Sequence, residues 1–256
     1  VRDIVLRPSD SVTMWYDSTL SRWTLLSLFI KEDTQTFHTP FYSTDYLGVA
    51  GAGTTEMQYP WELALLASAT HSATAGLGNH PGIMRCTSST TTNSGCYVMA
   101  SISSHIFAGG EFANFVFKIN TLANLTARMG YHDSITSADA VDGGYIEIPS
   151  TGNAVCKTAN NSTRTTSATI ATLAAATWYH AKVYTNSNAT SFTCELYSEA
   201  GNLLGTQTNT TNIPTGAGRE FGHGVTQTRL GTAAASAILD MDYMDKGSYR
   251  ALLRGQ

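Results

Sequence analysis

Hydrophobic and polar residues alternate with a period of two along most of the chain. The clearest case is residues 191–197, where Phe192, Cys194 and Leu196 alternate with polar or amphipathic residues. Successive side chains of a β-strand point to opposite faces, so this pattern predicts a half-buried strand. The same alternation occurs at Phe115, Phe117 and Ile119, at Tyr179, Ala181 and Val183, and at Leu239, Met241 and Tyr243. Strands spaced about ten or more residues apart predict a sandwich or a barrel.

Local signals refine this all-β prediction at two places. Residues 198–202 are rich in turn formers and precede the strand-like residues 203–207, so residues 191–207 are expected to form a hairpin. Helix signals are scarce. The best of them is residues 60–67, where Pro60 stands at a first-turn position before an apolar run, and a short helix is expected there.

The first 50 residues differ from the remainder in their higher charge density and in the closely spaced aromatic residues Trp15, Tyr16 and Trp23. Two short strands with a turn at Asp17 and Ser18 would account for this segment, but a lone hairpin is marginally stable and must pack on something. Residues 1–50 are therefore interpreted as an attachment arm, with the three aromatics as interface anchors. A glycine-rich stretch, residues 48–53, would link the arm to a domain over residues 56–256.

Composition argues against two classes of function. Charged residues make up 13% of the 256 residues, about half the usual share, and the formal net charge is −4. The basic residues form no run, so nucleic-acid binding is not expected. The apolar stretch at residues 25–30 is too short to cross a bilayer, so neither membrane insertion nor an export signal is expected.

Four cysteines, Cys86, Cys96, Cys156 and Cys194, have none of the spacings of a sulfur-ligated metal site. Cys86 and Cys96 flank a polar loop and could face each other across a hairpin, whereas Cys156 and Cys194 lie in strand-like segments. Two disulfides (Cys86–Cys96 and Cys156–Cys194) and four small buried thiols both remain open on this reasoning.

An ordered series of segments from about residue 56 onward resembles tailed-phage virion proteins with a concanavalin A-like, laminin G-like jelly-roll domain. The segments are residues 79–85 (NHPGIMR), 109–119 (GGEFANFVFKI), 144–148 (GYIEI), 176–183 (ATWYHAKV), 192–204, 211–215 (TNIPT) and 239–243 (LDMDY). Residues 6–10 and 15–17 also resemble the starts of such proteins. The set covers roughly 190 residues, each piece being a generic strand or turn.

The resemblance implies an all-β jelly-roll sandwich with a short N-terminal attachment arm. It further implies a structural protein at the virion surface, outside the cell, as a capsid decoration, head fibre or tail adhesin. Its partners would be other capsid or tail proteins, copies of itself in a homotrimer or higher oligomer, and surface glycans of the host or environment. The four cysteines and the long arm depart from that family pattern.

Enzymatic function is not expected, although the same fold class hosts glycoside hydrolases and polysaccharide lyases. Glycan hydrolysis needs two carboxylates facing each other across a cleft. The only strand-like pair with suitable spacing is Asp240 and Asp242, which is interpreted as an outward polar pair on a strand that buries Leu239, Met241 and Tyr243. A secreted polysaccharide-cleaving enzyme and a stand-alone carbohydrate-binding module are the alternatives.

A glycan site is expected at two segments. Tyr145 and Glu147 should share the face opposite Ile146 and Ile148, and an aromatic ring beside a carboxylate suits a sugar, whose C–H face stacks on the ring while its hydroxyls donate to the acid. A solvated strand face is the alternative reading of this pair. The tripeptide Tyr131, His132 and Asp133 would form another wall of the groove, or a turn. No cofactor is expected, with calcium near Asp139 and Asp142 as an option.

Overall fold

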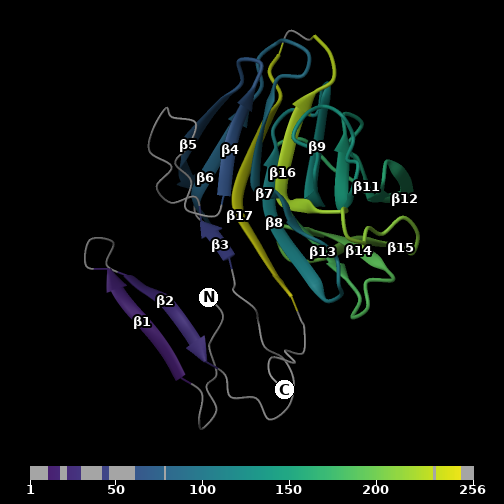
Figure 1. Ribbon diagram of the computed structural model, residues 1–256. Coiled ribbons are helices and arrows are strands. Elements are labelled where there is room, and N and C mark those ends of the chain that lie inside the picture. Colours follow the sequence, from purple (N-terminus) through teal and green to yellow (C-terminus); the bar gives the residue numbers. More distant parts are fainter. Residues whose placement is uncertain are drawn as a thin grey trace, which may run out of the picture. The chain divides into compact units, whose positions relative to one another are not determined.

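The computed structural model describes residues 11–17, 22–29, 42–45, 61–77, 79–232 and 235–248. The chain divides into two compact units, the first containing strands β1 and β2 and the second containing residues 38–250 (Figure 1). Every regular element among the described residues is a β-strand. None of these residues forms a helix with the length and hydropathy needed to span a bilayer.

The first unit is an antiparallel hairpin of β1 (Ser11–Asp17) and β2 (Arg22–Phe29). Tyr16 lies opposite Trp23 in its register, and Trp15 lies opposite Thr24. Strand β1 ends at Asp17 and β2 begins at Arg22, and the turn predicted at Asp17 and Ser18 lies partly outside the described residues. The three residues expected to anchor an interface, Trp15, Tyr16 and Trp23, are therefore all on this hairpin.

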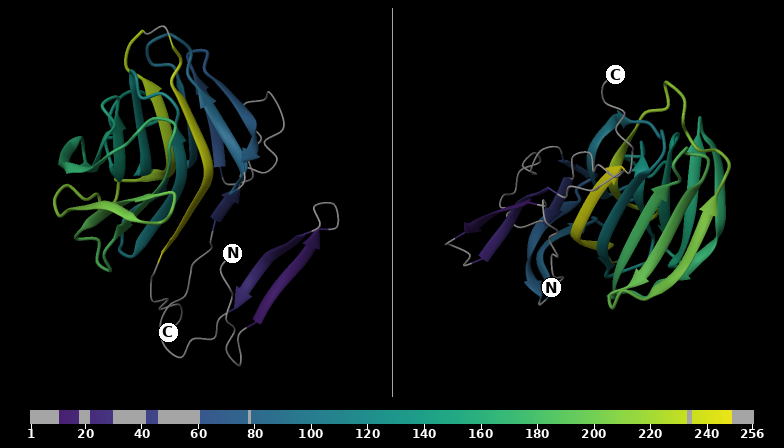
Figure 2. Two further views of the ribbon diagram at one scale, coloured as in Figure 1. Left: turned by 180° about the vertical axis from the view of Figure 1, so that it is seen from behind. Right: turned by 90° about the horizontal axis from the view of Figure 1, so that it is seen from below.

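The second unit consists of two antiparallel sheets (Figures 1 and 2). The seven-stranded sheet has the order β12 (Thr163–Thr172), β11 (Asn153–Asn160), β10 (Gly143–Pro149), β9 (Leu125–His132), β16 (Phe221–Arg229), β7 (Gly95–His105) and β4 (Trp61–Leu66). The eight-stranded sheet has the order β15 (Leu203–Asn209), β14 (Phe192–Ser198), β13 (Trp178–Thr185), β8 (Glu111–Ile119), β17 (Ile238–Ser248), β6 (His80–Thr87) and β5 (Thr70–Leu77), and β3 (Tyr42–Asp45) pairs with β17.

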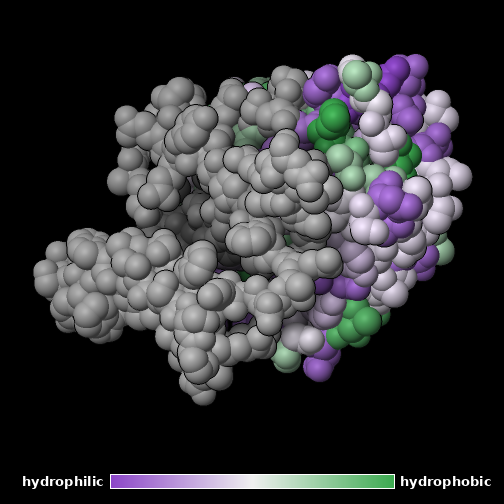
Figure 3. Space-filling model, turned by 60° about the horizontal axis from the view of Figure 1, so that its bottom comes forward, coloured by the Kyte–Doolittle hydropathy of each residue, from purple (hydrophilic) through white to green (hydrophobic). Residues whose placement is uncertain are grey.

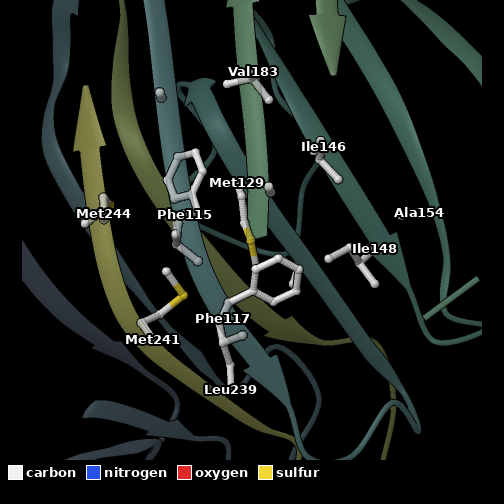
Figure 4. Packing of buried hydrophobic residues seen from close by; sticks show 14 of the residues in the cluster. Phe115, Phe117, Met129, Ile146, Ile148, Ala154, Val183, Leu239, Met241 and Met244 are labelled. Carbon is white, nitrogen blue, oxygen red and sulfur yellow. The ribbon is translucent and has the colours of Figure 1, made fainter. Parts of the chain in front are cut away.

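The hydrophobic core lies between the two sheets, where alternate side chains of each strand meet. Phe115 and Phe117 of β8 pack near Met129 of β9 and Ile146 and Ile148 of β10 (Figure 4). All five side chains are fully buried. Burial of each large apolar side chain contributes about 1.5–3 kcal/mol, so this layer is the main source of stability. The two-residue periodicity and the predicted jelly-roll sandwich are confirmed.

Residues 61–66 form strand β4, so the helix expected at residues 60–67 is wrong over the described part of that segment. Strand β4 pairs with β7 at the edge of the seven-stranded sheet. Leu63 is buried and Leu65 packs against the core cluster. Leucines two residues apart can face one core only in an extended chain, and this tertiary requirement overrides the local helix propensity.

Both pairs of cysteines form disulfides, and each disulfide joins one sheet to the other. Cys86 of β6 is bonded to Cys96 of β7, with 6.2 Å between their Cα atoms. Cys156 of β11 is bonded to Cys194 of β14, with 5.7 Å between their Cα atoms. The pairing of Cys86 with Cys96 is confirmed, but the expected hairpin between them is not, because β6 and β7 belong to different sheets.

A β-bulge in strand β17 changes which of its side chains face the core. Met241 lies opposite Phe117 and Tyr243 lies opposite Val116, so Asp242 is an extra residue in the ladder. After the bulge Met244 is buried in the core, and Tyr243 is half-buried with its hydroxyl donating to Asp245 on the outer face. The expected burial of Tyr243 beside Leu239 and Met241 is therefore wrong.

The described surface is predominantly polar, as Figure 3 shows for one face. Its exposed large hydrophobic residues are few: Ile106, Val141, Leu203, Leu204 and Leu230. Scattered apolar residues of this kind are ordinary on soluble domains. Polar contacts therefore dominate both outer faces of the sandwich.

Candidate functional site

Tyr131, one of the five expected glycan-binding residues, lies inside the sandwich. It is 2% exposed, belongs to the core cluster and donates its hydroxyl to the carbonyl of Phe112 at 2.8 Å. Burial, followed by the charge of Glu111, raises its pKa well above the ordinary value. Its placement as a wall of an accessible groove is corrected: odd-numbered residues of β9 face the core.

His132 and Asp133 both have structural roles, His132 as a buried ring and Asp133 as a hydrogen-bond acceptor for the backbone of the following loop. His132 is fully buried on the opposite side of β9, edge-on to Tyr145 with 5.6 Å between ring centroids. Burial and the positive charge of Arg128 lower its pKa to about 3. Asp133 accepts hydrogen bonds from the backbone N–H groups of Val141 at 2.9 Å and Asp142 at 3.2 Å. Tyr131, His132 and Asp133 therefore do not form one surface.

Tyr145 and Glu147 share the outer face of the seven-stranded sheet, as predicted, but Tyr145 is fully buried there. Residues 133–142, called here the cover loop, lie over this part of the sheet. Arg128 donates to the carbonyls of Thr136 and Ser137 at 3.5 Å each. Thr226 of β16 donates to the carbonyl of Ser134 in the same loop at 2.7 Å. Binding of a glycan at these residues stays a prediction, and the loop would have to move first.

Asp139 of the cover loop is held by four side chains, called here the carboxylate cradle. Tyr145 donates its hydroxyl to Oδ1 at 2.6 Å, and the Nε of Arg128 lies 3.2 Å from the same oxygen. The Nζ of Lys157 is 2.9 Å from Oδ2, and the Nε of Arg164 is 3.4 Å from it. Burial favours the neutral acid, but hydrogen bonds from Tyr145 and Lys157 and the charge of Arg128 outweigh it, lowering the pKa of Asp139 to about 2.

Glu147 completes the polar network beneath the loop. Its Oε2 is 2.9 Å from the Nε of Arg128, and its Oε1 is 2.7 Å from the Nζ of Lys157. The side chains of Arg128 and Lys157 are only 5% and 14% exposed. Buried charges of this kind require partners, and Glu147 and Asp139 together supply two carboxylates to Arg128 and Lys157.

Calcium does not fit the residues proposed for it. Asp139 is bound by the cradle, while Asp142 accepts from the N–H of Asn161 at 2.7 Å and lies 3.5 Å from Arg219. Carboxylates already satisfied by cations and backbone donors are poor calcium ligands. Within the part of the chain that is described, no group of three or more His, Cys, Asp or Glu side chains is arranged to hold a metal.

The Asp240 and Asp242 carboxylates lie on the outer side of β17 but are buried, contrary to the expected solvated pair. Asp240 receives two hydrogen bonds from Arg85, at 2.6 and 2.8 Å, and is 3.2 Å from Lys118. Burial opposes ionisation of Asp240, but these partners outweigh it and lower its pKa. Asp242 is 2.8 Å from the Nδ1 of His80. A carboxylate kept ionised in this way is unsuited to act as a general acid.

The outer face of the eight-stranded sheet carries a row of aromatic, charged and polar side chains that the sequence analysis does not single out. We call it the outer strip, and its members are Asn114, His180, Lys182, Tyr184, Glu195 and Tyr197. They lie on β8, β13 and β14, where His180 is opposite Tyr197, and Lys182 lies between Asn114 and Glu195. The sequence signal for this strip lies in residues 178–184 (WYHAKVY), where every second residue carries a ring or a charge.

Hydrogen bonds fix the side chains of the outer strip. Tyr184 and Tyr197 donate their hydroxyls to the two oxygens of Glu195 at 2.9 and 2.6 Å. His180 stacks on Tyr197 with 5.4 Å between centroids, and Lys182 lies over the Tyr184 ring at 5.1 Å. Burial and the bond to Glu195 raise the pKa of Tyr197 to about 12. All six side chains of the strip are only partly buried, so the strip is accessible from solvent.

The fold is shared with solved structures of low sequence identity. A protein of unknown function from Shewanella oneidensis MR-1, SO2946, superposes with a TM-score of 0.69 at 18% identity, covering 87% of this chain and 92% of that one. The lectin-like defence protein arcelin-5 of Phaseolus vulgaris gives 0.51 at 8%, covering 82% and 99%. A β-1,3-glucanase of Mycobacterium marinum gives 0.50 at 13%, covering 81% and 99%.

These likenesses establish a concanavalin A-like, lectin-like jelly roll and nothing beyond the fold. No curated protein matches the sequence. The model of one family, "SO2946-like, C-terminal domain", matches residues 79–242, which is more than half of the chain. The matched span contains most of the two-sheet sandwich, including the cradle and the outer strip. The chain therefore belongs to the SO2946-like C-terminal domain family.

Proposed function

We propose that this chain is a glycan-binding protein displayed on the surface of a tailed-phage particle. The observation that carries the binding function is the outer strip. Tyr184 and Tyr197 flank Glu195 on a rigid sheet, so a sugar ring can stack its C–H face on a tyrosine while its hydroxyls donate to the carboxylate. Because the hydrogen bonds already hold these side chains, little conformational entropy is lost on binding.

Three further observations support this proposal. The fold resembles that of arcelin-5 and of the carbohydrate recognition domain of Emp47p, whose TM-score is 0.51 at 11% identity, covering 82% of this chain and 96% of that one. Two disulfides suit a protein that works outside a reducing cytosol. The ordered segments described above resemble phage virion proteins, which is the basis for the placement on a capsid or tail.

Binding to the outer strip is tested with a glycan array. Tyr197→Ala removes a stacking surface and one partner of Glu195, so binding of the best array ligand should weaken at least 10-fold, in line with aromatic hot spots at interfaces (about 2 kcal/mol or more). Tyr197→Phe keeps the ring and should lose less. Thr169→Ala, an exposed residue of β12 in the other sheet, is the matched control and should bind as the wild type does. Equal binding by Tyr197→Ala and the wild type would reject the site.

Attachment to the particle is assigned to the hairpin of β1 and β2. We expect that Trp15→Ala combined with Trp23→Ala reduces incorporation of the full chain into particles by 10-fold or more, because large aromatic side chains dominate the binding energy of interfaces. Quantitative mass spectrometry of purified particles measures this. The partner would be another capsid or tail protein, with this chain as a homotrimer or higher oligomer. Unchanged incorporation would remove the hairpin from the attachment site.

A glycan-cleaving activity is the alternative function, supported by the fold it shares with the β-1,3-glucanase. The described structure gives this alternative no carboxylate pair of the expected kind, since Asp240 is paired with Arg85 and Asp242 is hydrogen-bonded to His80. A screen for reducing sugar and for unsaturated uronate decides between the two functions. Turnover that is lost in Glu147→Gln would favour the enzyme.

A further inference from the structure

The carboxylate cradle binds a carboxylate in the manner of a receptor. Each oxygen of Asp139 has two side-chain partners: Tyr145 and Arg128 at Oδ1, and Lys157 and Arg164 at Oδ2. The four partners come from four neighbouring strands of one sheet, β9 to β12. The carboxylate, by contrast, comes from the cover loop.

The positive charges of the cradle side chains require an anion at the position that the Asp139 carboxylate occupies. Arg128, Lys157 and Arg164 present three cations, and Glu147 is the one carboxylate of these strands in contact with them. Removing Asp139 would leave an excess of positive charge around a buried arginine and lysine, which is costly in a region of low dielectric. An anion from solution that replaced Asp139 would recover this energy.

The carboxylate of Asp139 is replaceable because the cover loop has no regular structure and the site opens to solvent at its rim. The Asp139 and Arg164 side chains are 24% and 31% exposed, whereas Arg128 is 5% exposed. Arg128 holds the loop through carbonyl contacts of 3.5 Å, at the long end for hydrogen bonds, while Arg164 donates to the carbonyl of Ala140 at 2.9 Å and Thr226 to that of Ser134 at 2.7 Å. The cations therefore belong to strands, and their anionic partner belongs to an irregular segment.

We propose that the cradle formed by Arg128, Tyr145, Lys157 and Arg164 binds the carboxylate of an acidic sugar residue, and that Asp139 occupies it in the free protein. The choice of a sugar rests on the function proposed above. The cradle lies on the seven-stranded sheet and the outer strip lies on the eight-stranded sheet, so the two sites are separate. An acidic glycan would bind here by displacing Asp139, with Tyr145 and Lys157 donating to the incoming oxygens.

The experiment is isothermal titration of the full chain with oligogalacturonate, with neutral galactose oligomers and poly-L-glutamate as comparison probes. Asp139→Ala empties the cradle, so we expect oligogalacturonate to bind it at least 10-fold more tightly than it binds the wild type, with an affinity that falls as salt is raised. Adding Arg164→Ala to Asp139→Ala should abolish the gain. Asp139→Asn keeps the side-chain volume and should show part of the gain, which protects the test if the alanine variant unfolds.

Three results would overturn the inference: no gain by a folded Asp139 variant, equal gain for the neutral oligomers, or tighter binding of poly-L-glutamate than of oligogalacturonate. The last result would identify an acidic peptide as the ligand. Thr169→Ala, the exposed residue of β12 already used as a control, should leave oligogalacturonate binding unchanged. Loss of neutral-glycan binding in Tyr197→Ala without any acid binding at the cradle would leave the proposed function standing and reject this inference alone.

Discussion

Replacement of Cys156 and Cys194 together by alanine is expected to lower the free energy of unfolding by about 4 kcal/mol. The disulfide closes a loop with a sequence separation of 38 residues, and loop-closure entropy lost from the unfolded chain gives about this value. The midpoint of thermal unfolding should fall by on the order of 10 °C. Urea unfolding followed by fluorescence, and differential scanning calorimetry, measure the two quantities.

The second disulfide supplies a matched comparison. Cys86 and Cys96 are separated by 10 residues, so their joint replacement by alanine should cost less, about 3 kcal/mol. Both bonds cross the same core between the same two sheets, and loop length is the main difference between them. A larger loss for the Cys86–Cys96 pair, or no loss for either pair, would show that chain entropy is not how these bonds stabilise the fold.

Acidification is expected to destabilise the sandwich through His132. Its pKa is lowered from an ordinary value of 6.5 to about 3 by burial and by Arg128. A group whose folded pKa is lowered binds fewer protons in the folded state, so its contribution is fully present above about pH 6.5 and is lost as the pH falls towards 3. The loss approaches about 1.4 kcal/mol for each pH unit in that window. Chemical denaturation between pH 7 and pH 4 measures it.

The difference between variants isolates this histidine from the carboxylates that also titrate. His132→Gln cannot take up the proton, so its stability should fall with a shallower slope between pH 6.5 and pH 4 than that of the wild type. Thr169→Ala, an exposed position of β12 that does not titrate, is the control and should keep the wild-type slope. Parallel slopes for His132→Gln and the wild type would mean that His132 is not kept neutral by burial.

The architecture of the second unit follows from short-range alternation in the sequence. Phe192, Cys194 and Leu196 face the core as their spacing predicts, and their hairpin partner β15 begins at Leu203. The pattern fails where a tertiary contact decides the outcome. Strand β4 at residues 61–66 has the composition of a helix, and only its pairing with β7 makes it extended.

The candidate site is harder to predict from the sequence. The alternation of side chains shows which residues share a face of a strand, but it does not show which other segment covers that face. The shared face of Tyr145 and Glu147 could be inferred from the two-residue period. Their burial could not be inferred, because it results from the folding of the cover loop over the sheet. The loop has no regular structure where it contacts Arg128, and its contact with Thr226 joins residues that are far apart in the sequence. The sequence leaves a groove wall and a turn open for Tyr131, His132 and Asp133, because it does not show that Tyr131 belongs to the core-facing set of β9.

The outer strip could have been predicted from the same two-residue period. In residues 178–184 one set of alternate side chains, Tyr179, Ala181 and Val183, was recognised as the core face. The complementary set contains His180, Lys182 and Tyr184, which is an unusual concentration of rings and charge on one strand face. The chemistry of a half-buried strand is carried by the side chains that do not enter the core.

The bulge in β17 shifts the alternation of core-facing and outward-facing side chains along this central strand. Asp242 is the residue that lets Met241 and Met244, three positions apart, both enter the core. If the ladder ran without the bulge at the same chain length, Tyr243 would turn inward and Met244 would turn towards water. The bulge therefore decides which side chains beyond Met241 enter the core.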